Sequence, residues 1–377
     1  MKVEYAYLTK QFANPKPILK QIEKLAKSGQ FTLGPKVEEF ETKFADFQGP
    51  KYAIGVNSGT DALILILKVL GIGPGDEVIT VANSFFATAA CIELVGAKIV
   101  FADVDEEYNL DPKKIEEKIT KKTKGILPVH WTGNPADMPA IMKIARKHKL
   151  HVIEDAAQAI DARIDGRGVG TFGIASEFSL HPIKNFNVWG DGGMITTDQK
   201  WIADKLKLMR NHGIKNRNEC EFFSENCRLH TIQAVVGLEL LPGIEELTNK
   251  RIKIAQKYDQ LLSDLPQITI PPRKKNVRQV YHTYILQAQD RDNLYKFLLD
   301  NGVEAKIHYP IPLHFQKAAR HLGYKKGDLP VTEDQAKHIF SLPIHQYLKA
   351  KEIEYVSEVI HKFYNKKSGV KTTKKSR

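Results

Sequence analysis

The 377-residue sequence has few cysteines, no long apolar run and no signal-peptide pattern at its N-terminus. Its three cysteines, Cys91, Cys220 and Cys227, include no Cys-x-x-Cys pair, which argues against a disulfide framework or a zinc site. The longest unbroken apolar run, 62–67, is far shorter than the roughly 18 residues of a membrane-spanning helix. We therefore expect a cytoplasmic chain that binds no metal and has no membrane partner.

Acidic residues are absent from the last twelve positions, 366–377, which carry six of the positive charges. The formal net charge is +12, so about half of it lies in this tail and the rest of the chain is modestly positive. No aromatic residue interleaves the tail's charges, so we expect a disordered basic end and no nucleic-acid partner. A modestly positive body suits small anionic substrates.

Short β-branched runs alternate with helical patterns over about residues 50–200, as in βαβ units on a largely parallel sheet. Strands are predicted at 52–56, 77–81, 98–102, 125–129, 151–154, 176–180 and 193–197. Helices are predicted at 61–70, 87–95, 112–119 and 137–148, and a long helical stretch at 229–262 breaks near Pro242-Gly243. A smaller α/β unit follows, with strands at 282–287 and 303–308 and helices at 292–301, 333–339 and 350–364.

These patterns indicate an α/β fold with a mostly parallel seven-stranded sheet. We expect a large domain over residues 1–250, a small C-terminal α/β domain over 251–365 and the basic tail over 366–377. Two common nucleotide-binding loops are missing: GIGPGD (71–76) follows a helix, GRGVG (166–170) lies in a polar loop, and no Walker A motif occurs. A dinucleotide-binding or P-loop enzyme is therefore not favoured.

The segment VNSGTDALILILKVL (56–70) runs from a strand into an apolar-faced helix. Ser58 is a natural N-cap, and the free amides of Gly59, Thr60 and Asp61, with the helix dipole, suit one phosphate group. Taken alone, the segment is more typical of an ordinary capped helix than of an anion site.

Two further segments supply an acid and a lysine. HVIEDAAQA (151–159) ends a buried strand on Asp155, which either faces a ligand or caps a helix. EFSLHPIKNFNVWGDGGMITTD (177–198) places Lys184 between a strand and a glycine-rich turn, where a lysine with a lowered pKa attacks carbonyl groups. A lone lysine usually lies on the surface, and a non-PLP α/β enzyme with such a lysine stays an alternative.

Together, the phosphate-sized site, Asp155 and Lys184 are the parts that pyridoxal phosphate (PLP) requires. The lysine forms a Schiff base with the cofactor, and the acid keeps the pyridine nitrogen protonated so that the ring withdraws electrons. The start of the helix holds the phosphate.

An ordered set of motifs resembles the DegT/StrS family of sugar aminotransferases over about residues 5–362. The motifs are SGQFTLGPKVEEFE, NSGTDAL, GPGDEVIT, NSFFATAACIELVGAKIVFADVD, YNLDP, PVHWTGNPADM, IEDAAQA, SLHPIKNFNVWGDGG, RNHG, NCRLHTIQAVVGLEL and HYPIPLH. The resemblance implies a PLP enzyme with the aspartate-aminotransferase fold, fold type I.

The resemblance also implies roles for matching positions. Lys184 would hold PLP and move the proton between cofactor and substrate carbons, and Asp155 would pair with the pyridine nitrogen. The other implied cofactor contacts are Gly59, Thr60 and Ser179 at the phosphate, Phe85 on the ring face and Gln158 at the phenolic oxygen. Asn226 matches a residue that reaches the phosphate from the neighbouring subunit, which implies a homodimer with shared active sites. Ser224 departs from the family's glycine and puts the path of that loop in doubt.

Four residues are implied near the sugar substrate: His181 and Trp131, which replace commoner family residues, and His308 and Tyr309 in the second domain. The implied reaction moves an amino group from L-glutamate, through the pyridoxamine form of the cofactor, to a nucleotide-linked keto sugar. Lys184 favours transfer over dehydration, since related dehydratases carry histidine there. The GDGG at 190–193 favours a 3-keto sugar, such as a UDP-3-keto-N-acetylglucosamine type used for lipopolysaccharide or lipid A. A 4-keto nucleotide sugar, an 8-oxo-octulosonate and a PLP-bound regulatory protein without turnover stay open.

Overall fold

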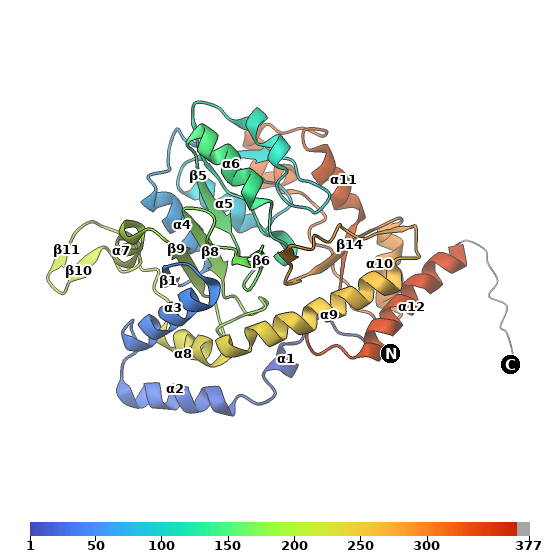
Figure 1. The fold of residues 1–377 in the computed structure, drawn as a ribbon, viewed down its shortest axis with the longest axis horizontal. Coiled ribbons are helices and arrows are strands. Elements are labelled where there is room, and N and C mark those ends of the chain that lie inside the picture. The colour runs from blue at the N-terminus through green and yellow to red at the C-terminus, as the bar shows by residue number, and fades with distance from the viewer. Residues whose placement is uncertain (368–377) are drawn as a thin grey trace.

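A seven-stranded sheet lies at the centre of this computed structural model, which describes residues 1–367 (Figure 1). Its strands are β1 (Tyr52–Val56), β2 (Glu77–Val81), β3 (Lys98–Ala102), β4 (Thr123–Ile126), β5 (His151–Asp155), β8 (Ala175–Ser179) and β9 (Gly193–Thr197). They are ordered β1-β9-β8-β5-β4-β2-β3. The pairs from β8 to β3 are parallel, and β9 runs antiparallel to both neighbours. The predicted mostly parallel seven-stranded sheet is confirmed.

Both faces of the sheet are covered by helices, because side chains alternate between the faces along each strand. In β9, Ile195 joins the core that contains α4 (Gly59–Val69), whereas its neighbour Met194 joins the core that contains α3 (Pro35–Gln48). Helices α5 (Phe86–Leu94), α6 (Met138–His148) and α7 (Lys200–Met209) also pack on the strands. Helix α8 (Thr231–Leu240) packs on α3, and α2 (Lys16–Ser28) packs on α8. A short helix, α1 (Leu8–Gln11), precedes α2 in the chain.

A second core lies toward the C-terminus. It joins α9 (Ile244–Leu262), α10 (Arg291–Asp300) and α12 (Ala350–Lys367) to a three-stranded sheet of β12 (Ile268–Thr269), β14 (Tyr284–Ala288) and β15 (Ile339–Leu342). The N-terminal Val3 also packs in this core and forms a bridge with Val303. α9 begins beside the first sheet and enters the second core at Ile254. The domain boundaries near residues 250 and 365 stay a prediction.

The remaining elements are short or peripheral. They are α11 (Pro330–His338), β6 (Arg163–Ile164), β7 (Arg167–Gly168), β10 (Ile214–Asn216), β11 (Glu219–Cys220) and β13 (Val277–Arg278). β10 and β11 form a hairpin that projects from one end of the molecule (Figure 1). α12 ends at Lys367, and the rest of the predicted basic tail lies outside the described residues.

The structure corrects two predicted elements. Residues 112–119 form two short 3-10 turns in place of an α-helix, and the backbone becomes extended at Ile119. Residues 303–308 form isolated bridges instead of a strand, because their partners belong to different segments: Val303 pairs with Val3 and Lys306 pairs with Ser341. Ser341 lies in β15, a strand that the predicted helix at 333–339 partly overlaps.

Candidate active site

A cavity of about 460 Å³ opens where the carboxyl ends of β5 and β8 meet the start of α4. This is where an open parallel sheet places its ligands. Eleven of the twelve predicted site residues line it: Gly59, Thr60, Phe85, Trp131, Asp155, Gln158, Ser179, His181, Lys184, His308 and Tyr309. Asn226 does not line it. The fold therefore brings together residues that are separated by about 250 positions in the sequence.

The start of α4 forms the anion-binding end of the cavity. Ser58 is the N-cap, and its hydroxyl accepts a hydrogen bond from the Asp61 amide at 3.0 Å. This corrects the prediction that the Asp61 amide is free for a ligand. The amides of Gly59 and Thr60 stay at the helix start, where the helix dipole favours an anion, and Ser179 adds a hydroxyl from β8.

Asp155 ends β5 and is held by two hydrogen bonds. Its Oδ2 accepts from the Thr88 hydroxyl at 2.7 Å, and its Oδ1 accepts from the Ala157 amide at 3.2 Å. Thr88 lies in α5 and in turn contacts the Ser84 hydroxyl at 2.7 Å. Hydrogen bonds to the ionised form favour a carboxylate, so this buried side chain presents a fixed negative charge to the cavity.

Lys184 lies in the turn that follows β8, where its amide donates to the His181 carbonyl oxygen at 2.9 Å. The Tyr7 hydroxyl donates to the Lys184 carbonyl oxygen at 3.2 Å and ties the N-terminal segment to this turn. Burial lowers the pKa of Lys184 below its ordinary value, while the charges of Glu177 and Asp155 oppose that shift. A lowered pKa raises the fraction of neutral amine, which is the nucleophile toward a carbonyl.

Two buried residues shape the wall beside Asp155. The Gln158 Oε1 accepts a hydrogen bond from the Thr132 amide at 2.8 Å, which leaves the NH2 end of this side chain to face a ligand. The Trp131 ring packs edge-on against Tyr108 at 5.4 Å between centroids. Trp131 is therefore fixed by the core, and its ring forms an apolar part of the cavity wall.

His308 and Tyr309 approach the cavity from the C-terminal part of the chain. The His308 Nδ1 lies 2.9 Å from the Ser341 hydroxyl, and burial together with Lys306 and Lys184 lowers the pKa of His308 to about 4. Burial and the charge of Asp155 raise the pKa of Tyr309 to about 12. Both side chains are therefore neutral at neutral pH. His181 is more exposed, and its Nε2 lies 3.9 Å from the Asp191 carboxylate.

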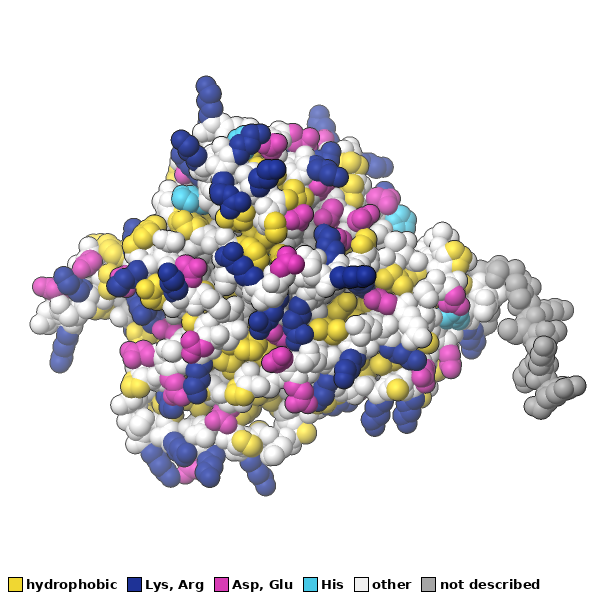
Figure 2. Space-filling view, viewed as in Figure 1, with side chains coloured by type: hydrophobic (Ala, Val, Ile, Leu, Met, Phe, Trp, Pro, Cys, Tyr) yellow, Lys and Arg dark blue, Asp and Glu magenta, His cyan; other side chains and the backbone are white. Residues whose placement is uncertain are grey.

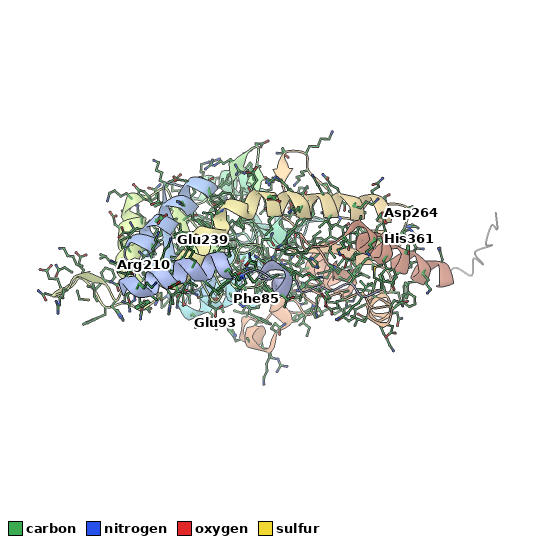
Figure 3. The ribbon with its side chains drawn as sticks, turned by 90° about the horizontal axis from the view of Figure 1, so that it is seen from below. Phe85, Glu93, Arg210, Glu239, Asp264 and His361 are labelled. Atoms are coloured by element: carbon green, nitrogen blue, oxygen red, sulfur yellow. The ribbon has the colours of Figure 1, made fainter. Side chains whose placement is uncertain are left out.

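Phe85 marks the mouth of the cavity. It precedes α5, is 52% exposed and lies near the middle of the molecule (Figure 3).

A larger, more open cavity of about 850 Å³ lies between α9 and α12. Asp264 and His361, which contact each other there at 3.0 Å, lie toward one end of the molecule, away from Phe85 (Figure 3). That second cavity combines lysines with acids but has no glycine-started helix, so the first cavity is the candidate active site.

Several cavity residues are missing from the sequence predictions, among them Thr88, Glu177 and His282. Thr88 belongs to the motif NSFFATAACIEL, but nothing in the sequence indicates that its hydroxyl reaches Asp155, 67 positions away. Glu177 stands two residues before Ser179, and β-strand periodicity puts both on one face of the sheet. That spacing is a signal that could have identified Glu177.

Asn226 lies at the base of the projecting hairpin. It forms an antiparallel bridge with Asn211, and the Asn211 Oδ1 accepts a hydrogen bond from Arg228 at 2.9 Å. Phe223, near the end of the segment that links the hairpin to Asn226, is 100% exposed.

Within residues 1–367, no cluster of three or more His, Cys, Asp or Glu side chains could hold a metal ion. No helix in the same part of the chain combines the length and apolarity needed to cross a membrane. Figure 2 shows basic and acidic side chains intermixed over the visible face.

The cavity residues fit PLP. The α4 amides and the Ser179 hydroxyl suit its phosphate, the donor-held Asp155 suits a protonated pyridine nitrogen, and Lys184 supplies the amine. A doubly covered, mostly parallel sheet with these groups at its carboxyl edge defines a PLP-dependent aminotransferase of fold type I. A model of the DegT/DnrJ/EryC1/StrS aminotransferase family matches residues 14–361. The chain belongs to this family, whose members use PLP.

Known proteins resemble the chain over nearly its whole length. It is 41% identical to the "Pleiotropic regulatory protein" of Geobacillus stearothermophilus, covering 97% of this chain and 99% of the relative. It is 39% identical to the "UDP-N-acetyl-3-dehydro-alpha-D-glucosamine 3-aminotranferase" of Acidithiobacillus ferrooxidans, covering 92% and 93%. The crystal structure of S. venezuelae DesV in complex with ketimine intermediate superimposes with a TM-score of 0.93 at 35% identity, covering 96% and 98%.

Proposed function

We propose that this enzyme transfers the amino group of L-glutamate to a nucleotide-linked keto sugar, with the ketone at carbon 3. One observation carries the proposal: Lys184, Asp155 and the start of α4 surround a single cavity that is large enough for a ring and its substrate. PLP, when bound there, supplies an electron sink that stabilises negative charge on a substrate carbon.

In this proposal, each side chain acts through the position that the fold gives it. The α4 amides and Ser179 hold the phosphate, and Asp155 keeps a proton on the ring nitrogen because Thr88 and Ala157 hold its carboxylate in the charged form. The Lys184 amine would hold the cofactor and, when free, would move a proton at its Nζ between the two reacting carbons. Phe85 would cover the ring face, and the Gln158 NH2 group would donate to the phenolic oxygen.

The substrate proposal rests on the residues at the mouth of the cavity and on a relative. His308 and Tyr309 offer neutral polar groups, and Trp131 adds aromatic surface, which suit a sugar ring more than a second phosphate. His181 lines the same cavity. The name of the Acidithiobacillus relative specifies a 3-dehydro amino sugar linked to UDP. The GDGG at 190–193 agrees with a 3-keto sugar of that type, destined for lipopolysaccharide or another surface glycan.

The proposal includes a homodimer with shared active sites. Two observations support an arm, formed by the β10–β11 hairpin and the segment up to Asn226, that reaches a partner. The arm projects with Phe223 exposed, and Asn226 does not line the cavity of its own chain. In the dimer, Asn226 would contact the phosphate in the neighbouring subunit. Three free cysteines, including the exposed Cys220, support a reducing cytoplasm as the location.

Visible spectroscopy tests the proposal. We expect the purified protein with PLP to show the absorption band of lysine-bound cofactor, L-glutamate to bleach it, and a 3-keto nucleotide sugar to restore it. If only a 4-keto nucleotide sugar or only an 8-oxo-octulosonate restored the band, the ketone of the substrate would be assigned to carbon 4 or carbon 8 instead of carbon 3. A band that L-glutamate leaves unchanged would contradict the donor, and bound PLP with no turnover for any donor would favour a regulatory protein.

A matched pair of lysine variants tests the role of Lys184. Lys184→Ala should abolish the lysine-bound band and turnover while the far-ultraviolet circular dichroism stays native. Lys121→Ala removes an exposed lysine far from the cavity and should leave both unchanged. Turnover by Lys184→Ala would contradict the assignment of Lys184 as the lysine that holds PLP and moves the proton.

A further inference from the structure

Glu177 is a cavity residue to which the proposed function gives no role. It lies in β8 and is 1% exposed, and its carboxyl oxygens accept no hydrogen bond from any donor among the described residues. The Asp155 carboxyl is the group within hydrogen-bonding reach of it. An ionised carboxylate that is buried without a donor is strongly destabilised. A buried polar group of this kind therefore calls for a physical explanation.

Two neighbouring elements fix the place of the Glu177 carboxyl. β5 puts Asp155 beside it, because the two residues are paired in the parallel register and side chains in register share a face of the sheet. α4 puts Gly59 against it, since a Cβ atom at Gly59 would stand 2.1 Å from the Glu177 Oε1. Glu177 thus lies between the acid for the ring nitrogen and the seat for the phosphate.

The titratable groups that face Glu177 decide which of the two acids carries a proton. They are Asp155 from β5, Lys184 from the turn after β8 and Cys91 from α5, while β9 contributes Ile195 in register. Asp155 receives two hydrogen bonds and Glu177 receives none, so the negative charge is more stable on Asp155. Burial and the charge of Asp155 raise the pKa of Glu177 well above its usual range, and Lys184 opposes this shift.

We propose that Glu177 is a neutral carboxylic acid at neutral pH, and that its proton allows the PLP phosphate and the Asp155 carboxylate to lie on either side of it. The inference rests on the proposed cofactor site. It makes Glu177 a positioning residue, because it acts through the phosphate seat and Asp155. An ionised Glu177 would repel both anions, so its ionisation would weaken PLP binding.

Infrared spectroscopy of the protein without PLP tests the protonation state directly. The difference spectrum between wild type and Glu177→Gln at pH 7 should show the carbonyl stretch of a protonated carboxyl group. The control pair, wild type and Glu358→Gln, removes an exposed glutamate of α12 and should show carboxylate bands. Carboxylate bands for Glu177 would overturn the proposal. If the glutamine variant does not fold, Glu177→Ala supplies the same difference band.

PLP titration tests the consequence for the cofactor. Glutamine mimics the neutral acid, so Glu177→Gln should bind PLP within about threefold of wild type at pH 7, and a loss of more than about tenfold would refute the proposal. Above pH 7, the PLP affinity of wild type should fall relative to that of the variant by up to about tenfold per pH unit. This fall should occur only in the pH range where the infrared band of the protonated acid disappears. If the ratio of the two PLP affinities changed with pH while the band of the protonated acid persisted, the proposal would also be refuted. Wild type that binds no PLP would instead contradict the proposed function, and the infrared result would still decide the state of Glu177.

Discussion

At the scale of single residues, the site depends on which acid is charged. Asp155 is held as a carboxylate by Thr88 and Ala157, whereas Glu177 beside it has no donor. In water the aspartic acid side chain is only slightly more acidic than that of glutamic acid, with pKa values of about 3.9 and 4.3, so most of the difference between them comes from the hydrogen bonds that the fold supplies.

Asp155→Asn should slow the reaction of the bound cofactor with L-glutamate by on the order of 100-fold or more, because the amide cannot hold a proton on the ring nitrogen. The amide keeps the size of the side chain, so the fold should survive. Thr88→Val removes one of the two donors and should give a smaller loss. Stopped-flow absorbance at the cofactor band measures both rates, and a wild-type rate for Asp155→Asn would refute the role of this acid.

The residues of the site were largely predictable from the sequence, whereas their partners were not. Lys184 and Asp155 stand next to strand ends, and Gly59 stands at a helix start, so local patterns indicate each of them. The spacing between Glu177 and Ser179 indicates that both lie on one face of a strand, but it does not show what lies beside Glu177. The contact of Thr88 with Asp155 depends on the approach of α5 to β5, and the place of Glu177 beside Asp155 depends on the β5–β8 register. Such long-range contacts leave no local pattern in one sequence.

At the scale of elements, the phosphate seat depends on the close approach of β9 to α4. Gly193 begins β9, and a Cβ atom there would stand 2.4 Å from the Ser58 carbonyl oxygen and 2.9 Å from the Gly59 amide nitrogen. These are backbone atoms that no rotamer change can move away. The glycine therefore lets the strand pass directly under the start of the helix.

Gly193→Ala should destabilise the protein by about 1–3 kcal/mol through overpacking, and should weaken PLP binding because the α4 amides shift. Gly243→Ala is the matched control, since a Cβ atom at Gly243 meets nothing within 4 Å. Urea unfolding and PLP titration compare the two variants. Equal PLP affinities in Gly193→Ala and Gly243→Ala would contradict the claim that this contact shapes the seat.

The attachment of the N-terminal segment to the second core should depend on pH. His345 is buried, its Nε2 donates to the Glu4 carbonyl oxygen at 3.1 Å, and its Nδ1 has no partner among the described residues. Burial, which is the largest cause, lowers the pKa of His345 to about 4; Lys10 and Arg251 lower it further, and the Glu4 hydrogen bond and the Glu352 charge oppose them.

Between pH 6.5 and 4, the unfolded chain therefore binds a proton at His345 that the folded chain does not. Stability contributed by the neutral imidazole is present above this window and is lost as the pH falls, by on the order of 3 kcal/mol. His345→Gln keeps a donor for Glu4 and should lose less stability between pH 7 and 4.5 than wild type. Urea unfolding at the two pH values measures this, and equal losses would disprove it.

Element prediction succeeded where neighbours in sequence are also neighbours in space. The strands of the large sheet and the helices between them follow local periodicity. Residues 112–119 have a helical pattern, but their chain direction changes at Ile119 after two short turns. Residues 303–308 have a strand pattern, but they pair with the N-terminus and with β15 at single positions, which a local pattern does not reveal.

At the scale of the whole molecule, the projecting hairpin is the part that a single chain leaves unexplained. Its arm carries Phe223, fully exposed, and Ile214, which is also exposed. Burying a phenylalanine side chain contributes about 1.5–3 kcal/mol, so a partner surface that covers this arm would gain stability. In the proposed homodimer, that surface is the mouth of the neighbouring cavity.

A mixture of two defective variants tests whether active sites are shared between subunits. Lys184→Ala removes the PLP-binding lysine from the cavity of its own chain, whereas Asn226→Ala should weaken PLP binding in the cavity of its partner. A dimer with one chain of each kind holds one cavity with both defects and one cavity with none. Co-expression with two different tags, followed by isolation of doubly tagged protein, yields these mixed dimers.

Each mixed dimer should therefore bind PLP at one site with wild-type affinity, and an unselected equal mixture should hold about a quarter of the wild-type sites. The parent variants measured alone set the background. If Asn226 acted within its own chain, the mixed dimer would hold one cavity lacking Lys184 and one lacking Asn226, and no wild-type site would appear. The appearance of wild-type sites thus distinguishes an arm that reaches the partner from an arm that folds back on its own chain.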